Sequence, residues 1–255
     1  MLYVQERDDY SGRRMSTHFL SWLIPPLAFA LTLAACGESD PPAPAAAEPA
    51  ELLDPFTSCW APEADPDCPT IIEKRLIGLT DGSVERRGDT LWVSSSESGP
   101  IPFVNEYGEG GRYIRFTYYG SADEIGAHIV RVGFYEGGTF SLVDRRTGNQ
   151  TDVYSAPVVS PSGQRFATAG LDLVAGYGPN GVQVWAVTPH GPRLEWTLSG
   201  GESWGADGVF WLSDDALEFT RHIVVPGRSE PERIHTRLTV GRDRMIVEST
   251  EDPGG

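Results

Sequence analysis

Positive charge is scarce in this chain, and lysine is nearly absent. Lys74 is its only lysine, and 20 basic residues stand against 36 acidic ones, for a formal net charge of −16. Nucleic acids and anionic lipid surfaces are bound by clusters of positive charge, so we expect neither as a partner. Solubility explains the acidic balance, and attraction to a basic partner is the alternative. A chain rich in Ala, Gly and Pro with one lysine also indicates a GC-rich genome.

The recurrent motifs of metal and cofactor sites are missing as well. No glycine-rich phosphate loop enters a helix, and no nicotinamide or flavin fingerprint is present. The acidic pairs Asp123-Glu124 and Asp214-Asp215 lack the alternating pattern of a calcium loop. Four histidines are scattered without H-x-H or H-E-x-x-H spacing, namely His128, His190, His222 and His235. We therefore expect no metal and no cofactor.

A long hydrophobic run is also lacking. The apolar stretch Phe19 to Ala35 is interrupted by Pro25-Pro26, and it is shorter than the roughly 20 apolar residues of a comfortable membrane span. Arg13-Arg14 precedes it and small residues end it. This order of positive flank, short apolar core and small residues is typical of an export signal.

The end of that stretch, Leu33-Ala34-Ala35-Cys36-Gly37, resembles the lipobox of bacterial lipoprotein signal peptides. The resemblance implies that residues 1–35 are removed and that Cys36 is fatty-acylated, which attaches the protein to a membrane. An ordinary secretory signal is the alternative. Met15 stands where such a signal begins, so residues 1–14 are explained as a misassigned start or a dispensable extension. Gly37, rather than Asp, implies the outer membrane of a Gram-negative bacterium, on its periplasmic or its outer face.

The other two cysteines fit an exported protein. Cys59 and Cys68 are separated by eight residues, and such a pair usually forms a disulfide in an oxidising compartment. Closing so short a loop stabilises a fold by about 2–3 kcal/mol in the chain-entropy model. A metal or redox pair is the alternative, but the spacing fits neither C-x-x-C nor a zinc knuckle.

Composition divides the chain beyond Cys36 into three parts. Residues 36–56 are rich in Pro, Ala and carboxylates without apolar periodicity, which predicts a disordered, extended stalk. Residues 57–250 are expected to form one β-rich domain, and residues 251–255 a disordered tail.

Short segments with period-two alternation dominate that domain, and glycine-containing turns separate them. Leu194, Trp196 and Leu198 alternate with polar residues most clearly. No long amphipathic helix is evident. The pattern predicts an all-β fold, an antiparallel meander of hairpins, with strands over residues 113–119, 128–134, 139–143, 182–187, 193–198, 209–212, 233–240 and 245–247.

A weak internal repeat occurs within these strands. Ala156 to Ala167 carries an apolar strand through Ser160-Pro161-Ser162-Gly163, and Val209 to Phe219 repeats the apolar, tight-turn, apolar order. The pattern resembles the inner strands of TolB-like and WD-type β-propellers, with Ser162 in place of the usual Asp. The resemblance implies a partial or small propeller-like fold. A β-sandwich and an irregular barrel are the alternatives.

One segment matches a catalytic motif in form. Gly201-Glu202-Ser203-Trp204-Gly205 fits G-x-S-x-G, and Asp214 or Asp215 and His222 or His235 follow in the order acid, histidine. The mechanism needs the serine at a strand-to-helix turn, whereas another strand is expected after Ser203. We therefore expect no catalytic residue, and keep a small periplasmic serine hydrolase as an alternative.

Aromatic residues are numerous for a domain without an expected cofactor. Burial between sheets is the expected role of most. If several of them lay on one rim near the Gly-rich segment 106–111, they would form a face for a ligand or a partner. The full set of these aromatic residues is Tyr107, Tyr113, Tyr118, Tyr119, Tyr135, Tyr154, Tyr177, Trp185, Trp204 and Trp211.

The sequence therefore predicts a membrane-anchored lipoprotein whose non-catalytic β-rich domain binds a protein or an envelope component. Besides the hydrolase, an inhibitor of a basic extracellular enzyme remains an alternative, because it would use the acidic surface.

Overall fold

A computed structural model describes residues 3–6, 54–60, 63–108, 113–241 and 244–249. The lipobox, Cys36, most of the expected stalk and the expected tail lie outside these residues. Among the helices that are described, none is long and apolar enough to cross a membrane.

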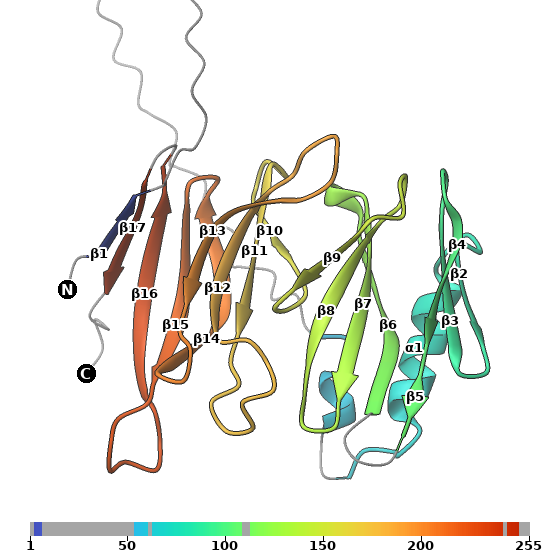
Figure 1. The fold of residues 1–255 in the computed structure, drawn as a ribbon, viewed down its shortest axis with the longest axis horizontal. Helices are drawn as coiled ribbons and strands as arrows, with labels where there is room; N and C mark the ends of the chain where they lie inside the picture. The colour runs from blue at the N-terminus through green and yellow to red at the C-terminus, as the bar shows by residue number, and fades with distance from the viewer. Residues whose placement is uncertain (1–2, 7–53, 61–62, 109–112, 242–243, 250–255) are drawn as a thin grey trace, which may run out of the picture. The chain divides into compact units, whose positions relative to one another are not determined.

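The described fold is all-β, as predicted, and consists of four antiparallel sheets that follow one another along the chain (Figure 1). Within each sheet, strands that are consecutive in sequence are neighbours, which is the expected meander of hairpins. None of the four described sheets closes into a barrel. The propeller-like and sandwich arrangements stay predictions.

A short helical region precedes the first sheet. The 3-10 helix η1 (Thr57–Trp60) is joined by the Cys59–Cys68 disulfide to the first residue of α1 (Cys68–Gly78), so the disulfide that the spacing predicts is present. Helix α1 was not predicted, because its most buried residue is Glu73 rather than an apolar one. Its apolar positions therefore give little helical periodicity.

The first two sheets are formed by the residues that follow α1. Strands of the first are β2 (Val84–Arg87), β3 (Thr90–Ser95) and β4 (Gly99–Val104). Strands of the second are β5 (Glu106–Tyr107), β6 (Tyr113–Ala122), β7 (Ala127–Phe134), β8 (Gly137–Asp144) and β9 (Gln150–Val153), with the 3-10 turn η2 (Asp123–Ile125) between β6 and β7.

The last two sheets have four consecutive strands each. The third contains β10 (Val158–Val159), β11 (Arg165–Gly170), β12 (Gly181–Ala186) and β13 (Arg193–Ser199). The fourth contains β14 (Trp204–Ser213), β15 (Ala216–Ile223), β16 (Glu232–Val240) and β17 (Arg244–Ser249), and β1 (Tyr3–Glu6) pairs with its edge strand β17.

The two copies of the weak repeat occupy equivalent places in these sheets. Hairpin β10–β11 opens the third sheet and hairpin β14–β15 opens the fourth. Their turns also touch, because the backbone N–H of Ser162 donates a 2.8 Å hydrogen bond to the Asp214 carboxylate. The repeat thus corresponds to a recurring structural unit.

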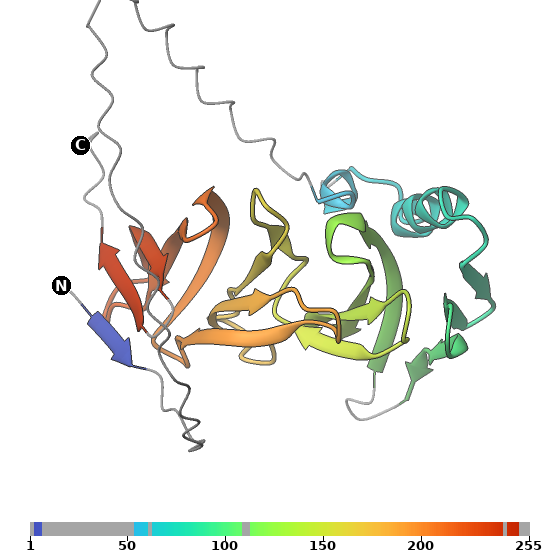
Figure 2. The same cartoon turned by 90° about the horizontal axis from the view of Figure 1, so that it is seen from above.

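Apolar cores lie between successive sheets (Figure 2). Alternation in β7 turns Val130 toward the first sheet and Ile129 toward the third. Leu91 and Val93 of β3 share the core with Val130, while Phe166 of β11 shares the core with Ile129. A third core joins the third and fourth sheets around Trp196, Leu217 and Phe219.

The fold begins earlier than the sequence predicts. Phe56 is only 4% exposed and stacks on Tyr119 of β6, with ring centroids 5.4 Å apart. The Asp54 carboxylate accepts a hydrogen bond from the Phe56 backbone N–H. Residues 54–56, which composition assigns to the stalk, are therefore part of the folded unit.

Candidate functional site

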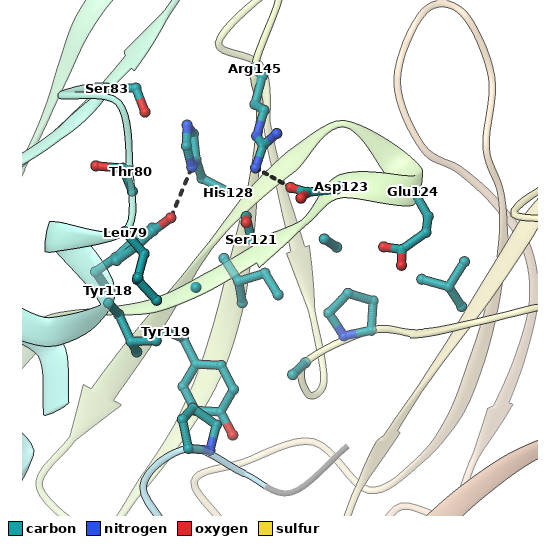
Figure 3. Close-up of a pocket in the computed structure, with 18 of the residues that line it drawn as sticks. Leu79, Thr80, Ser83, Tyr118, Tyr119, Ser121, Asp123, Glu124, His128 and Arg145 are labelled. Carbon is teal, nitrogen blue, oxygen red and sulfur yellow. Dashed lines mark hydrogen bonds and ion pairs between the residues drawn. The ribbon is translucent and has the colours of Figure 1, made fainter. Parts of the chain in front are cut away.

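A cavity of about 1060 Å³ lies where α1, the first sheet, strands β6 and β7 and the segment leading into β10 meet (Figure 3). We call it the serine-lined cavity, because several of its lining residues carry a hydroxyl group. They include Thr80, Ser83, Ser94, Ser95, Ser96 and Ser121.

Apolar side chains also line the serine-lined cavity. Leu76 comes from the end of α1, Leu79 directly follows that helix, Ile129 comes from β7, and Val158 and Val159 form β10. A ligand that matches this mixed lining has both apolar and polar parts.

Tyr118 and His128 form the most buried polar pair of the cavity wall. The Tyr118 side chain is 1% exposed and His128 is 3% exposed, and the phenol oxygen lies 3.2 Å from His128 Nδ1. Ser121 pairs with His128 across β6 and β7, and a register shift next to Tyr118 brings the tyrosine beside the same ring. The pair is therefore positioned by the strand ladder itself.

The other ring nitrogen of His128 has no hydrogen-bond partner within the described residues. In Figure 3 the ring lies between Ser83 and Arg145, with one nitrogen toward Tyr118 and the other turned away from it. This nitrogen is therefore available to a ligand in the cavity as a hydrogen-bonding group.

Burial keeps both members of the pair uncharged at neutral pH. It lowers the pKa of His128 to about 4, and repulsion from the Arg145 guanidinium acts in the same direction. Burial also raises the pKa of Tyr118 to about 12. The imidazole is therefore a neutral hydrogen-bonding group at this site.

Charges around the serine-lined cavity are mostly negative. Four carboxylates line it, those of Asp54, Asp81, Asp123 and Glu124, against one guanidinium, that of Arg145. Arg145 is paired with Asp123, and this pairing and a hydrogen bond from Ser121 lower the pKa of Asp123. An anionic ligand is consequently disfavoured here.

Two common catalytic arrangements are not found among the described residues of the cavity wall. His128 is hydrogen-bonded to Tyr118 and to no serine, and within the described residues no group of three His, Cys, Asp or Glu side chains is placed to hold a metal.

The residues of the G-x-S-x-G pattern are not assembled into a catalytic site. Ser203 ends a tight turn that leads into β14, not into a helix, and its backbone N–H donates to the Gly200 carbonyl. His222 lies 2.9 Å from Asp207, and His235 hydrogen-bonds to Glu218.

The two acids of that pattern also have other partners. Asp214 accepts from Ser162, and Asp215 pairs with Arg165 over 2.6 Å. The order of residues in the sequence therefore does not become a catalytic geometry in space.

The aromatic residues divide between core and surface. Tyr118, Trp185, Trp204 and Trp211 are buried, while Tyr107, Tyr135 and Tyr177 are exposed. Tyr107 and Tyr113 lie together with ring centroids 5.8 Å apart, but residues 109–111 of the expected rim are outside the described residues.

The sequence does not predict the Tyr118–His128 pair, because His128 has no second histidine at a metal-binding spacing and belongs to no catalytic motif. Its position within an apolar strand segment is the available signal.

Comparison with known proteins provides no relative: no protein-family model, no curated protein and no solved structure matches the chain.

Proposed function

We propose that this chain is an exported lipoprotein, anchored to the outer membrane through a fatty-acylated Cys36, and that its β-rich domain binds an envelope component without catalysis. The signal-like segment that ends at Cys36 supports the export step. The Cys59–Cys68 disulfide suits an oxidising compartment outside the cytoplasm.

The observation that carries the binding function is the free ring nitrogen of His128 in the wall of the serine-lined cavity. Several lining residues carry hydroxyl groups, and the carboxylates outnumber the single paired guanidinium. The ligand is therefore amphipathic, with a polar end that is neutral or positively charged.

Mass spectrometry of protein purified from its native host tests the anchor. Acylated Cys36 at the new N-terminus is expected, and Cys36→Ser should release the protein from the membrane fraction. An unmodified Cys36 sulfur in the native protein would contradict the proposal.

Native mass spectrometry with solubilised envelope material tests the binding site. His128→Phe removes the hydrogen-bonding nitrogen and adds bulk to the cavity wall, so it should abolish retention of the envelope component. His190→Phe is the matched control, because His190 is exposed on a turn and should leave retention unchanged. Equal retention by both variants would contradict this assignment of the site.

Labelling with a serine-directed fluorophosphonate separates binding from hydrolysis. We expect no modification, because Ser203 has no base beside it in the described structure. Stoichiometric labelling of Ser203 would instead support the hydrolase.

A further inference from the structure

A second, smaller hollow lies on the other face of β6. It has a volume of about 420 Å³ and we call it the arginine pocket, defined by Phe56, Arg115, Thr117, Tyr119, Arg131 and Phe140. Arg115, Thr117 and Tyr119 alternate along β6 and so share one face of the sheet.

Aromatic rings form one wall of the arginine pocket. Phe56 stacks on Tyr119 at 5.4 Å with an interplanar angle of 26°, and Phe140 meets Tyr119 edge-on at 5.0 Å and 87°. Burial and the neighbouring Asp54 carboxylate raise the pKa of Tyr119, so its phenol is neutral. This wall suits a flat apolar or aromatic group.

The guanidinium-bearing residues Arg115 and Arg131 also line the arginine pocket. Gly133 stands directly opposite Arg115 in the ladder between β6 and β7. Nη1 of Arg131 comes within 3.7 Å of the place that a Cβ on Gly133 would take, so the Arg131 side chain extends toward Arg115. The absence of side chains at Gly133 and Gly138 leaves room for this guanidinium.

Arg115 differs from most arginines of this acidic chain. Arg86, Arg87, Arg146, Arg165 and Arg237 each pair with a carboxylate. The guanidinium of the half-buried Arg115 has no hydrogen-bond or ion-pair partner within the described residues.

A buried hydroxyl lies beside these guanidinium groups. Thr117 is 6% exposed and pairs with Arg131 across the ladder. Its hydroxyl has no hydrogen-bond partner within the described residues, and it lines the pocket. One carboxylate, that of Asp54, also lines the pocket, where it accepts a hydrogen bond from the Phe56 backbone N–H at 2.8 Å.

We propose that the arginine pocket binds an organic anion, a carboxylate, sulfonate or phosphate carried on an aromatic or flat apolar body. The anionic group accepts hydrogen bonds from Arg115 and Thr117, and the body lies against the rings of Phe56, Tyr119 and Phe140. Guanidinium groups bind such oxygens through paired, charge-assisted hydrogen bonds. The arginine pocket shares Asp54 and Tyr119 with the serine-lined cavity, whose other charged groups favour the opposite kind of ligand.

Calorimetric titration of the full chain with phenyl phosphate tests the proposal. Arg115→Gln should weaken binding by about tenfold or more, since a hydrogen bond to a charged group is lost. Thr117→Val keeps the shape of the side chain and should weaken binding several-fold. Arg228→Gln changes the net charge equally at an exposed loop residue and should leave affinity unchanged.

Two further probes define what the pocket recognises. Benzyl alcohol lacks the anion and inorganic phosphate lacks the ring, so each should bind more weakly than phenyl phosphate. The proposal is overturned if phenyl phosphate does not bind, if either probe binds as tightly, or if Arg115→Gln and Arg228→Gln behave alike. Urea unfolding of each variant confirms that weakened binding does not come from unfolding.

Discussion

The buried carboxylate of Glu73 accepts a hydrogen bond of 2.7 Å from the backbone N–H of Tyr118, which joins α1 to β6. The same carboxylate pairs with Arg86 of β2, so one side chain connects the helix to the first two sheets. Because Tyr118 forms part of the serine-lined cavity, this contact also fixes the cavity wall.

We expect Glu73→Ala to destabilise the fold by about 2–4 kcal/mol, because it leaves the buried Tyr118 N–H without an acceptor and Arg86 without its carboxylate partner. The free energy of unfolding in urea measures the effect. Glu85→Ala, which breaks the exposed Arg87–Glu85 pair, is the control and should leave the unfolding midpoint almost unchanged. Equal effects would show that the Glu73 contact does not support the fold.

Acidification should destabilise the protein through His128. Its pKa is about 4 in the folded state, against roughly 6.5 in the unfolded chain. Between these values the unfolded chain binds more protons, so the stabilisation is complete above pH 6.5 and is lost as pH falls toward 4. The difference amounts to about 3 kcal/mol at most.

Urea unfolding at pH 7 and pH 4.5 checks this pH dependence. His128→Phe should reduce the loss of stability on acidification, whereas His190→Phe, at an exposed turn, should retain all of it. If the wild type and His128→Phe lost the same free energy of unfolding between pH 7 and pH 4.5, His128 would not titrate as described.

An indole hydrogen bond helps to connect the third and fourth sheets. Trp211 of β14 is 5% exposed and donates from Nε1 to the Val158 carbonyl over 2.8 Å. Trp211→Phe removes the donor while keeping an aromatic ring, and should destabilise the fold by about 1–2 kcal/mol. Denaturant unfolding measures this, and an unchanged midpoint with an unchanged slope would contradict it.

Removing the Cys59–Cys68 disulfide should lower stability by about 2–3 kcal/mol, because the unfolded chain regains the freedom of the short loop. The double variant Cys59→Ser, Cys68→Ser can be compared with the oxidised wild type by thermal unfolding. The reduced wild type provides the control, since it should match the double variant. If the double variant showed no folded baseline in thermal unfolding, the disulfide would instead be required for the entire domain to fold.

Alternation of side chains allowed much of the fold to be predicted. All eight strand segments expected from the sequence overlap strands, and Leu194, Trp196 and Leu198 do lie in β13. Strand β3 was missed, because Trp92 stands between Leu91 and Val93 and makes a continuous apolar run without alternation in polarity. Helix α1 was missed because Glu73 occupies its buried face.

The candidate sites were harder to predict than the strands. Tyr118 and His128 meet through a register shift between β6 and β7, and Phe56 reaches Tyr119 from more than sixty residues away. No local pattern carries such information. The G-x-S-x-G motif around Ser203 is the opposite case: the sequence pattern is present, but the acids and histidines expected to act with Ser203 contact other residues.

Asp54 and Tyr119 line both the serine-lined cavity and the arginine pocket, and the ring of Phe56 stacks on that of Tyr119. Asp54 and Tyr119 therefore form a partition between the two cavities. A substitution at either of them would reshape both volumes at once.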